Sequence, residues 1–420
     1  MKTRNKILIG LGLTAIAGAI LITYMQSRTQ GHGQTKMEVT PQLLARGAYL
    51  ADAGDCAGCH TTKGGQQFGG GRPFETPMGT IYSTNISSDK KYGIGSYSYE
   101  DFVDAVQNGI APFGNLYPAM PYASYHKISP EDMKALYAYF MHTPPAIQPD
   151  RDNDMIFPAN IRLGLKFWNW FEVDHKPYQA NPEKSDSWNR GQYLVEGLGH
   201  CGECHSPRNI LMGTEQSKAL QGGIVDGLNA PNITATALKA RGWDHKTLAQ
   251  FLKTGSSPKG TAFGEMFIVE KDSLSKLNNQ DIAAITTYLL DGDNQLRTMP
   301  IKKSFTTTEQ KMPGYNTFMA NCSGCHGNHG EGIPNVAPAL YGNATIANPD
   351  IFNTTAVIWQ GIPEHTYNQE QSYYAMPGYK GQLSKQQVTE LINFLHQSMT
   401  KDTPTITEED VSKVIKTLEK

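Results

Sequence analysis

The chain repeats one five-residue pattern three times: Cys56-Ala57-Gly58-Cys59-His60, Cys201-Gly202-Glu203-Cys204-His205 and Cys322-Ser323-Gly324-Cys325-His326. Together these stretches use all six cysteines of the sequence. The pattern Cys-X-X-Cys-His is the signature of covalent haem c attachment. Its thiols form thioethers with the haem, and the adjacent histidine is presented to the iron. We therefore expect three covalently bound haem c groups in one polypeptide, and hence electron transfer.

Each motif stands in the same local arrangement. A short helical pattern precedes it, in which Tyr49, Tyr193 and Tyr315 lie seven, eight and seven residues before the first cysteine. An amphipathic helix follows it at 130–142, 280–290 and 385–398, with apolar residues at i, i+3, i+4 and i+7. Ser129, Asp281 and Ser384 near the helix starts suit N-capping.

This threefold outline predicts a mainly α fold of three tandem class I cytochrome c domains. In each domain the early and the terminal helix should cross and close one side of the haem. The glycine beside each tyrosine would let these helices approach closely. The expected divisions of the chain are a signal or anchor segment at 1–30, domain 1 at 38–143, a linker at 144–186, domain 2 at 187–291, a linker at 292–310, domain 3 at 311–400 and an amphipathic helix at 401–420.

The N-terminus predicts delivery to a membrane. Lys2, Arg4 and Lys6 precede an uncharged stretch from Ile7 to Met25, which is near the length of about 20 residues that spans a bilayer. We expect a membrane-directed helix that places the rest of the chain on the periplasmic side of the inner membrane. A retained anchor is favoured over a long signal peptide because no clean small-X-small cleavage site follows.

Each predicted domain also offers a methionine in a loop before its last helix. These are Met120, Met266 and Met376, which lie 60, 61 and 50 residues after the motif histidines His60, His205 and His326. A low-spin electron carrier needs a second axial ligand, and a methionine thioether raises the haem potential. Met78, Met212 and Met399 are the competing candidates. We expect His60 and Met120, His205 and Met266, and His326 and Met376 to be the iron ligands.

The proximal histidines need acceptors for their other ring nitrogen. In domain 3 we expect the carbonyl of Pro338, twelve residues after His326. Domains 1 and 2 share a different element, Thr84-Asn85-Ile86-Ser87 and Pro231-Asn232-Ile233-Thr234, and so resemble each other more than domain 3. Seven other histidines have no shared placement across the repeats, and we interpret them as surface or structural residues: His32, His126, His200, His245, His329, His365 and His396.

Two segments leave alternatives open. Six prolines between 143 and 187 argue against regular structure there. Within this linker the aromatic run 165–171 either packs between domains 1 and 2 or contacts a membrane or a partner. The tail has a capping box at Thr407 and Asp410 and an apolar stripe, and it docks either on domain 3 or on a partner or membrane surface.

Four stretches carry a resemblance to a known family: GDCAGCHTTKGGQQFGGGRPFETPMGTIYSTNIS, YPAMPYASYHKISPEDMKALYAYF, GHCGECHSPRN and CSGCHGNHGEGIPNVAPALYGN. They resemble the triheme cytochrome c subunit of bacterial membrane-bound dehydrogenases that oxidise alcohols, aldehydes, gluconate or related polyols, over roughly residues 40–400. The resemblance implies a partner subunit carrying PQQ or flavin, and ubiquinone in the membrane as the acceptor. It also implies haem cysteines and axial ligands at the residues named above.

The function expected from the sequence is therefore electron transfer from a periplasmic dehydrogenase subunit to ubiquinone. A net charge of -2 gives no basic excess that would suggest nucleic acid as a partner. No catalytic acid–base pair or nucleotide-binding loop is evident, so we do not expect this chain to oxidise the organic substrate. The alternatives are a donor subunit for a terminal oxidase, a multihaem peroxidase or reductase with an open iron site, and a non-redox zinc module.

Overall fold

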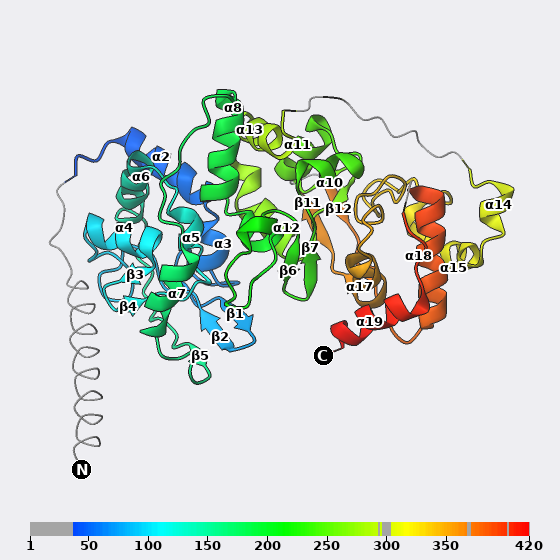
Figure 1. The fold of residues 1–420 in the computed structure, drawn as a ribbon, viewed down its shortest axis with the longest axis horizontal. Helices are drawn as coiled ribbons and strands as arrows, with labels where there is room; N and C mark the ends of the chain where they lie inside the picture. The colour runs from blue at the N-terminus through cyan, green and yellow to red at the C-terminus, as the bar shows by residue number, and fades with distance from the viewer. Residues whose placement is uncertain (1–36, 293–294, 296–303, 368–370, 401–402, 420) are drawn as a thin grey trace, which may run out of the picture.

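The computed structural model describes residues 37–292, 295, 304–367, 371–400 and 403–419. Three mostly helical units follow one another in a row, from blue at one end through green to red at the other (Figure 1). We call them the first unit (38–143), the second unit (187–291) and the third unit (311–400). The elements of the first unit are α2 (Pro41–Ala53), α3 (Cys56–His60), β1 (Pro73–Thr76), β2 (Gly79–Tyr82), α4 (Tyr99–Asn108), β3 (Ile110–Ala111), β4 (Gly114–Asn115), α5 (Tyr122–Tyr125) and α6 (Pro130–Phe140).

The segment between the first two units contains regular structure, contrary to the expectation from its prolines. Its strand β5 (Asp154–Met155) pairs antiparallel with β2, and β1–β2–β5 form one sheet. Its helix α7 (Gly164–Glu172) contains the aromatic run. Trp168 donates a hydrogen bond from Nε1 to the carbonyl of Leu211 in the second unit, whereas Trp170 and Phe171 are exposed. The aromatic run thus bridges two units with one face and meets solvent with another.

The second unit repeats the plan of the first, with one local change. Its elements are α8 (Asp186–Tyr193), the π-helix η2 (Leu194–Leu198), α9 (Gly202–His205), η3 (Gln216–Lys218), β6 (Gly223–Val225), β7 (Leu228–Ala230), α10 (Ala235–Ala240), α11 (His245–Thr254), β8 (Ser256–Ser257), β9 (Gly260–Thr261), α12 (Glu265–Asp272), η4 (Leu274–Lys276) and α13 (Asn279–Leu289). The π-helix takes up the one extra residue between Tyr193 and Cys201, because a π-turn inserts a residue into a helix without breaking it.

The third unit and the tail form the other end of the row. Their elements are α14 (Thr307–Gln310), α15 (Pro313–Asn321), α16 (Ser323–His326), α17 (Phe352–Gln360), β10 (Gly361–Ile362), β11 (His365–Tyr367), β12 (Gln371–Tyr373), β13 (Met376–Pro377), α18 (Lys385–Met399) and α19 (Glu408–Leu418). Helix α19 begins with the expected capping box of Thr407 and Asp410. Its Val411 and Ile415 are buried in the core of the third unit, so the tail docks on its own chain.

The terminal helices begin close to where the periodicity places them. Ser129 and Ser384 accept hydrogen bonds from the third residue of α6 and α18, as expected of N-caps. The N-cap of α13 is Asn278, and Asp281 is instead the residue whose backbone N–H it binds. The carboxylate of Asp281 is thereby left for contacts with other elements.

Each terminal helix crosses the early helix of its unit at a glycine. A Cβ atom on Gly47, Gly191 or Gly314 would overlap the carbonyl oxygen of Ala135, Ala284 or Glu390, respectively. These pairs, α2 with α6, α8 with α13 and α15 with α18, have the most extensive contacts between elements. The three crossings confirm that the glycine beside each tyrosine serves close helix approach.

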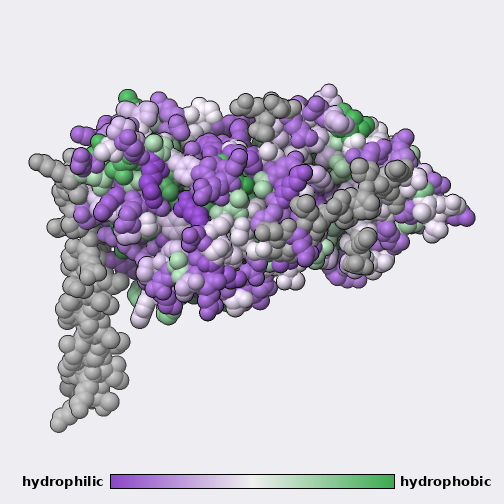
Figure 2. All heavy atoms as spheres, turned by 90° about the horizontal axis from the view of Figure 1, so that it is seen from above, coloured by the Kyte–Doolittle hydropathy of each residue, from purple (hydrophilic) through white to green (hydrophobic). Residues whose placement is uncertain are grey.

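The buried side chains form two cores. One cluster joins the first and second units, including Leu50, Leu136, Leu194 and Ile285, and the other lies in the third unit around Phe318 and Phe394. The first two units therefore share a core. The face seen from above is mainly hydrophilic, with scattered hydrophobic residues (Figure 2).

No helix within the described ranges is long and apolar enough to cross a bilayer. The membrane-directed helix expected within 1–30 lies outside the described residues.

Candidate functional site

The three motifs lie on or at the start of the short helices α3, α9 and α16. Asp55 and His200, which directly precede the first cysteine in the first two motifs, both have left-handed backbone with φ of 50° and 35°. This turn ends the early helix and starts the motif helix at an angle to it. The cysteines and the histidine of each motif are thus held on one turn of backbone.

Each motif histidine has one ring nitrogen fixed by a backbone carbonyl. Nδ1 of His60 lies 2.6 Å from the carbonyl oxygen of Thr84, and Nδ1 of His326 lies 2.8 Å from that of Pro338. In the second unit Nδ1 of His205 lies 2.7 Å from the carbonyl oxygen of Pro231. Donation from Nδ1 leaves the Nε2 lone pair available to a metal ion.

These three carbonyls identify the hydrogen-bond acceptors that the sequence predicts for the motif histidines. Pro338 is the acceptor that the spacing indicates. In the first two units the acceptor is the residue just before Asn85 and Asn232, so the shared Asn-Ile element marked the right segment without identifying the atom. Burial lowers the pKa of all three imidazoles, which keeps them neutral, as a metal ligand must be.

The first unit encloses a cavity of about 1270 Å³. Cys56, Cys59, His60 and Met120 all line it, so the structure brings the whole predicted set of the first unit to one space. The rest of the lining is largely apolar, with Leu50, Ile94, Phe102 and Leu136 among the residues. This largely apolar lining suits a large apolar macrocycle.

The third unit encloses a cavity of about 1210 Å³ with the corresponding set. Cys322, Cys325, His326 and Met376 line it. Strand β13 carries Met376 and pairs with β10, so the methionine is positioned by backbone hydrogen bonds at the cavity wall. Its equivalent in the first unit, Met120, follows the β3–β4 hairpin.

In the second unit, Met266 lies in the first turn of α12 and packs half-buried against the shared core. Gly109 and Gly255 end the equivalent helices α4 and α11 with φ of 64° and 68°. A two-stranded hairpin follows each glycine, β3–β4 in the first unit and β8–β9 in the second, and leads to the methionine. The local path to Met266 therefore matches the path to Met120 as far as the hairpin. Met266 itself lies in a helix, where the sequence predicts a loop.

The competing methionines lie elsewhere. Met78 and Met212 are 40% and 44% exposed. Met399 is fully buried in the core of the third unit and packs against Gly330. None of the three lines either cavity.

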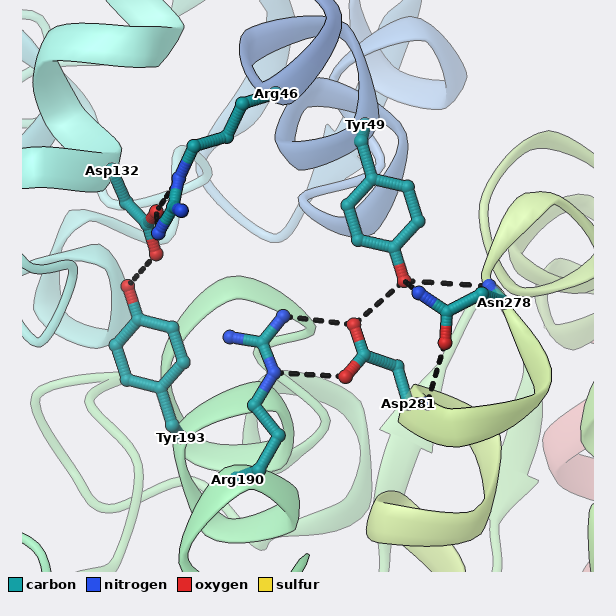
Figure 3. A network of polar contacts seen from close by, with 7 residues as sticks. All are labelled: Arg46, Tyr49, Asp132, Arg190, Tyr193, Asn278 and Asp281. Carbon is teal, nitrogen blue, oxygen red and sulfur yellow. Dashed lines mark hydrogen bonds and ion pairs between the residues drawn. The ribbon is translucent and has the colours of Figure 1, made fainter. Parts of the chain in front are cut away.

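The first and second units are joined by two matching networks (Figure 3). The hydroxyl of Tyr49 donates to Asp281 at 2.6 Å, and the hydroxyl of Tyr193 donates to Asp132 at 2.7 Å. Each aspartate also binds an arginine of its own unit, Arg190 for Asp281 and Arg46 for Asp132. Each unit thus gives a tyrosine to the other's aspartate.

At this interface Asp281 is ionised and Tyr49 is neutral. Burial pushes the pKa of Asp281 upward, but hydrogen bonds from Arg190 and Tyr49 outweigh it and hold the pKa below its usual value. Burial, followed by the hydrogen bond to Asp281, raises the pKa of Tyr49. The pair is therefore a carboxylate accepting from a neutral phenol at ordinary pH.

A second bridge runs from the first motif to the second methionine. Arg72 donates from Nη1 to the carbonyl oxygen of Gly58, inside the first motif, and from Nη2 to both carboxylate oxygens of Glu265, at 2.9 and 2.7 Å. Glu265 directly precedes Met266. The start of helix α12, which carries Met266, is thereby bonded to the motif of the first unit.

Two buried cations were not identified from the sequence. Lys259 is 3% exposed, and its Nζ has no hydrogen-bond partner within the part of the chain that the structure describes. Arg241 is 9% exposed and donates to the carbonyls of Asn232 and Ala237, and burial lowers its pKa to about 10. A buried cation is costly without an anion, and the carboxylate of Asp244 acts on Lys259 and opposes the fall in its pKa that burial causes.

The remaining histidines divide into several kinds of contact. His200 packs edge-on to Tyr125 of the first unit, and His396 is buried beside the carbonyl of Pro404. His365 lines the cavity of the third unit, which we call the third cavity. The sequence predicts a surface or structural role for His365 and does not indicate that it lines a cavity, because no histidine recurs at this position in the other two repeats.

Burial raises the pKa of the Cys201 thiol to about 12 and that of the Cys204 thiol to about 11. In the described ranges, no group of three or more His, Cys, Asp and Glu side chains is arranged to hold a metal ion.

Comparison with known proteins agrees with this arrangement. The family model described as cytochrome c matches residues 44–144 and 312–399. The chain is 39% identical over 398 residues to the gluconate 2-dehydrogenase cytochrome c subunit of Pantoea cypripedii, covering 89% of this chain and 90% of the relative. It is 36% identical over 399 residues to the cytochrome c subunit of alcohol dehydrogenase (quinone) of Gluconacetobacter polyoxogenes, covering 89% and 84%.

A third relative is shorter. The chain is 33% identical over 302 residues to a diheme cytochrome c-type protein of Cereibacter sphaeroides, covering 68% of this chain and 97% of the relative.

Proposed function

The chain belongs to the family of cytochrome c subunits of dehydrogenase complexes, and on that premise we propose that it is a triheme electron relay between a periplasmic dehydrogenase and ubiquinone. Members of this family transfer electrons and are not the catalytic subunits. The single observation that supports the proposal most strongly is the gathering of two cysteines, a histidine and a methionine at each of the two large cavities.

The proposed haem attachment follows the motifs. Thioethers would form on Cys56 and Cys59, on Cys201 and Cys204, and on Cys322 and Cys325. The iron ligands would be His60 with Met120, His205 with Met266, and His326 with Met376. When bound, each haem supplies a site that takes up and releases a single electron.

The protein's own residues would control this chemistry in two ways. The carbonyls of Thr84, Pro231 and Pro338 orient the proximal imidazoles and increase their basicity as ligands. Apolar cavity walls keep water from the haem face, which favours the less charged reduced state. We propose that the three units are separate domains with the bounds 38–143, 187–291 and 311–400.

The partner and the location follow from the relatives and from the N-terminal sequence. Relatives named as subunits of gluconate and alcohol (quinone) dehydrogenases support a dehydrogenase partner. The resemblance noted in the sequence implies that this partner carries PQQ or flavin. The basic residues and apolar stretch of residues 1–30 support an anchor in the inner membrane, with the haem units on the periplasmic side. Ubiquinone in that membrane would then be the acceptor.

The test is purification of the full chain from detergent-solubilised membranes, with partners identified by mass spectrometry. We expect a dehydrogenase to co-purify and its substrate to reduce the chain's haems. Addition of a soluble ubiquinone analogue should then reoxidise them. Co-purification with terminal oxidase subunits, or oxidation of an organic substrate by the isolated chain, would contradict the proposal.

A further inference from the structure

The third cavity is completed by the second unit. Thr261 and Phe263, from the loop that leads to Met266, line the cavity together with Met376. Between them, the carbonyl of Ala262 accepts a hydrogen bond from the hydroxyl of Tyr367 at 2.7 Å. Thr261 and Phe263 of the second unit therefore form part of the wall of the third unit's cavity.

A close ring stack lies at this wall. The rings of Phe267 and His365 have centroids 3.9 Å apart and planes inclined by 22°. Phe267 directly follows Met266, and His365 begins β11 and lines the third cavity. Tyr367 closes the cluster with its ring 5.4 Å from Phe267 at 83°. One aromatic contact thus links the second methionine loop with the third cavity.

The stack leaves one polar atom of His365 unexplained. Its Nε2 is buried and has no hydrogen-bond partner among the described residues. A buried polar atom without a partner costs about 1–3 kcal/mol. The residue faces a cavity that suits a haem, and a haem carries two carboxylates at its edge. A carboxylate there would accept a hydrogen bond from Nε2 and remove this cost.

We propose that His365 is a positioning residue for the third haem, donating Nε2–H to a haem carboxylate while its ring stacks on Phe267 of the second unit. The inference rests on the proposed function, since it needs a haem in the third cavity. One side chain would then fix the third haem against the loop that carries the second methionine. An electron lost by the second centre would be gained by the third across this contact.

Two substitutions separate the parts of the proposal. His365→Phe keeps an aromatic ring for the stack and removes the N–H. Without this donor the carboxylate keeps its full negative charge, which favours the oxidised haem. We expect the potential of the third haem alone to fall by about 59 mV, the one-electron equivalent of a tenfold change in its reduction equilibrium. Phe267→Leu should leave that potential unchanged and slow electron exchange between the second and third centres about tenfold.

The measurements are a spectroelectrochemical titration of each haem and the rate of internal electron exchange after flash reduction, in the full detergent-solubilised chain. His365→Gln retains a donor and should restore most of the potential, and it replaces His365→Phe if that variant does not fold. A third potential that is unchanged in His365→Phe, or equally lowered in His365→Gln, would overturn the inference. Haem content distinguishes the two levels: fewer than three haems in the unaltered chain contradicts the proposed function itself.

Discussion

The hydroxyl of Tyr49 in the first unit donates a 2.6 Å hydrogen bond to the carboxylate of Asp281 in the second. Tyr193 returns the same contact to Asp132. Both aspartates occupy the third position of their terminal helix, and both tyrosines lie two residues after the glycine of a helix crossing. Equivalent residues of two repeats therefore hold the repeats together. The third unit has Gln387 at the position of the aspartates, and its core is separate.

Removing either tyrosine hydroxyl should weaken the pairing of the first two units. A hydrogen bond to a charged group contributes about 1.5–3 kcal/mol, so we expect Tyr49→Phe and Tyr193→Phe each to lower the free energy of unfolding by roughly 2 kcal/mol. Denaturant unfolding followed by the Soret band measures this. Tyr92→Phe, whose partly exposed ring packs under the ammonium group of Lys91, is the matched control and should change little. Equal stability of all three variants would contradict a role for the exchanged hydrogen bonds.

The glycine crossings should tolerate no side chain. In Gly47→Ala the new Cβ would overlap the carbonyl oxygen of Ala135, and the two helices would have to separate. Overpacking of this kind costs about 1–3 kcal/mol, and we expect a loss near the upper end. Gly164→Ala is the control, because a Cβ there meets no atom within 4 Å. Thermal unfolding of both variants is the measurement, and similar melting temperatures would show that the crossings are looser than described.

Loss of an axial methionine should open one iron. Met376 lines the third cavity, and alanine in its place leaves that coordination position to solvent. We expect Met376→Ala to bind added imidazole or carbon monoxide at one haem of three, with a fall in that haem's potential. Met78→Ala, at an exposed site, should bind neither. Optical titration with each ligand tests this, and an unaltered spectrum in Met376→Ala would exclude Met376 as a ligand.

Stability should fall with rising pH because of one buried carboxyl. Glu270 is 2% exposed, and burial together with nearby Asp272 raises its pKa from 4.5 to about 7. The folded state then holds a proton that the unfolded chain releases, so this contribution is complete below about pH 4.5 and is lost as pH rises through about 7. Glu270→Gln should be more stable than the unaltered chain at pH 8, by about 2 kcal/mol, and equal to it near pH 4.5.

Denaturant titrations of both proteins at a series of pH values give this difference directly. A constant difference between pH 4.5 and 8 would mean that the pKa of Glu270 is the same in the folded and the unfolded chain.

The repeated plan could be predicted from sequence because local rules act three times. The motifs mark the haem helices, the periodicity gives the terminal helices to within a few residues, and glycine next to tyrosine marks each crossing. The tail shows the limit of such rules. Its capping box and apolar stripe predict helix α19, but an apolar stripe is compatible with any apolar partner, and only the packing of Val411 and Ile415 shows which surface it covers.

Contacts between units could not be predicted in the same way. Arg72 and Glu265 are separated by 193 residues, and nothing in the local pattern of either indicates the other. The N-capping role that the sequence predicts for Asp281 is also wrong: Asn278 caps the helix, and the carboxylate of Asp281 instead contacts Tyr49 and Arg190. The linker prolines were overinterpreted, because proline restricts the backbone at single positions and leaves room between them for α7.

The most direct test of the account is the haem content of the purified full chain, by pyridine haemochrome against protein mass, with a reductive titration of the same sample. We predict three covalently bound haem c groups and the uptake of three electrons per chain. Two haems or fewer, or haem that extracts with acidified organic solvent, would contradict the central claim that each of the three motifs holds a redox centre.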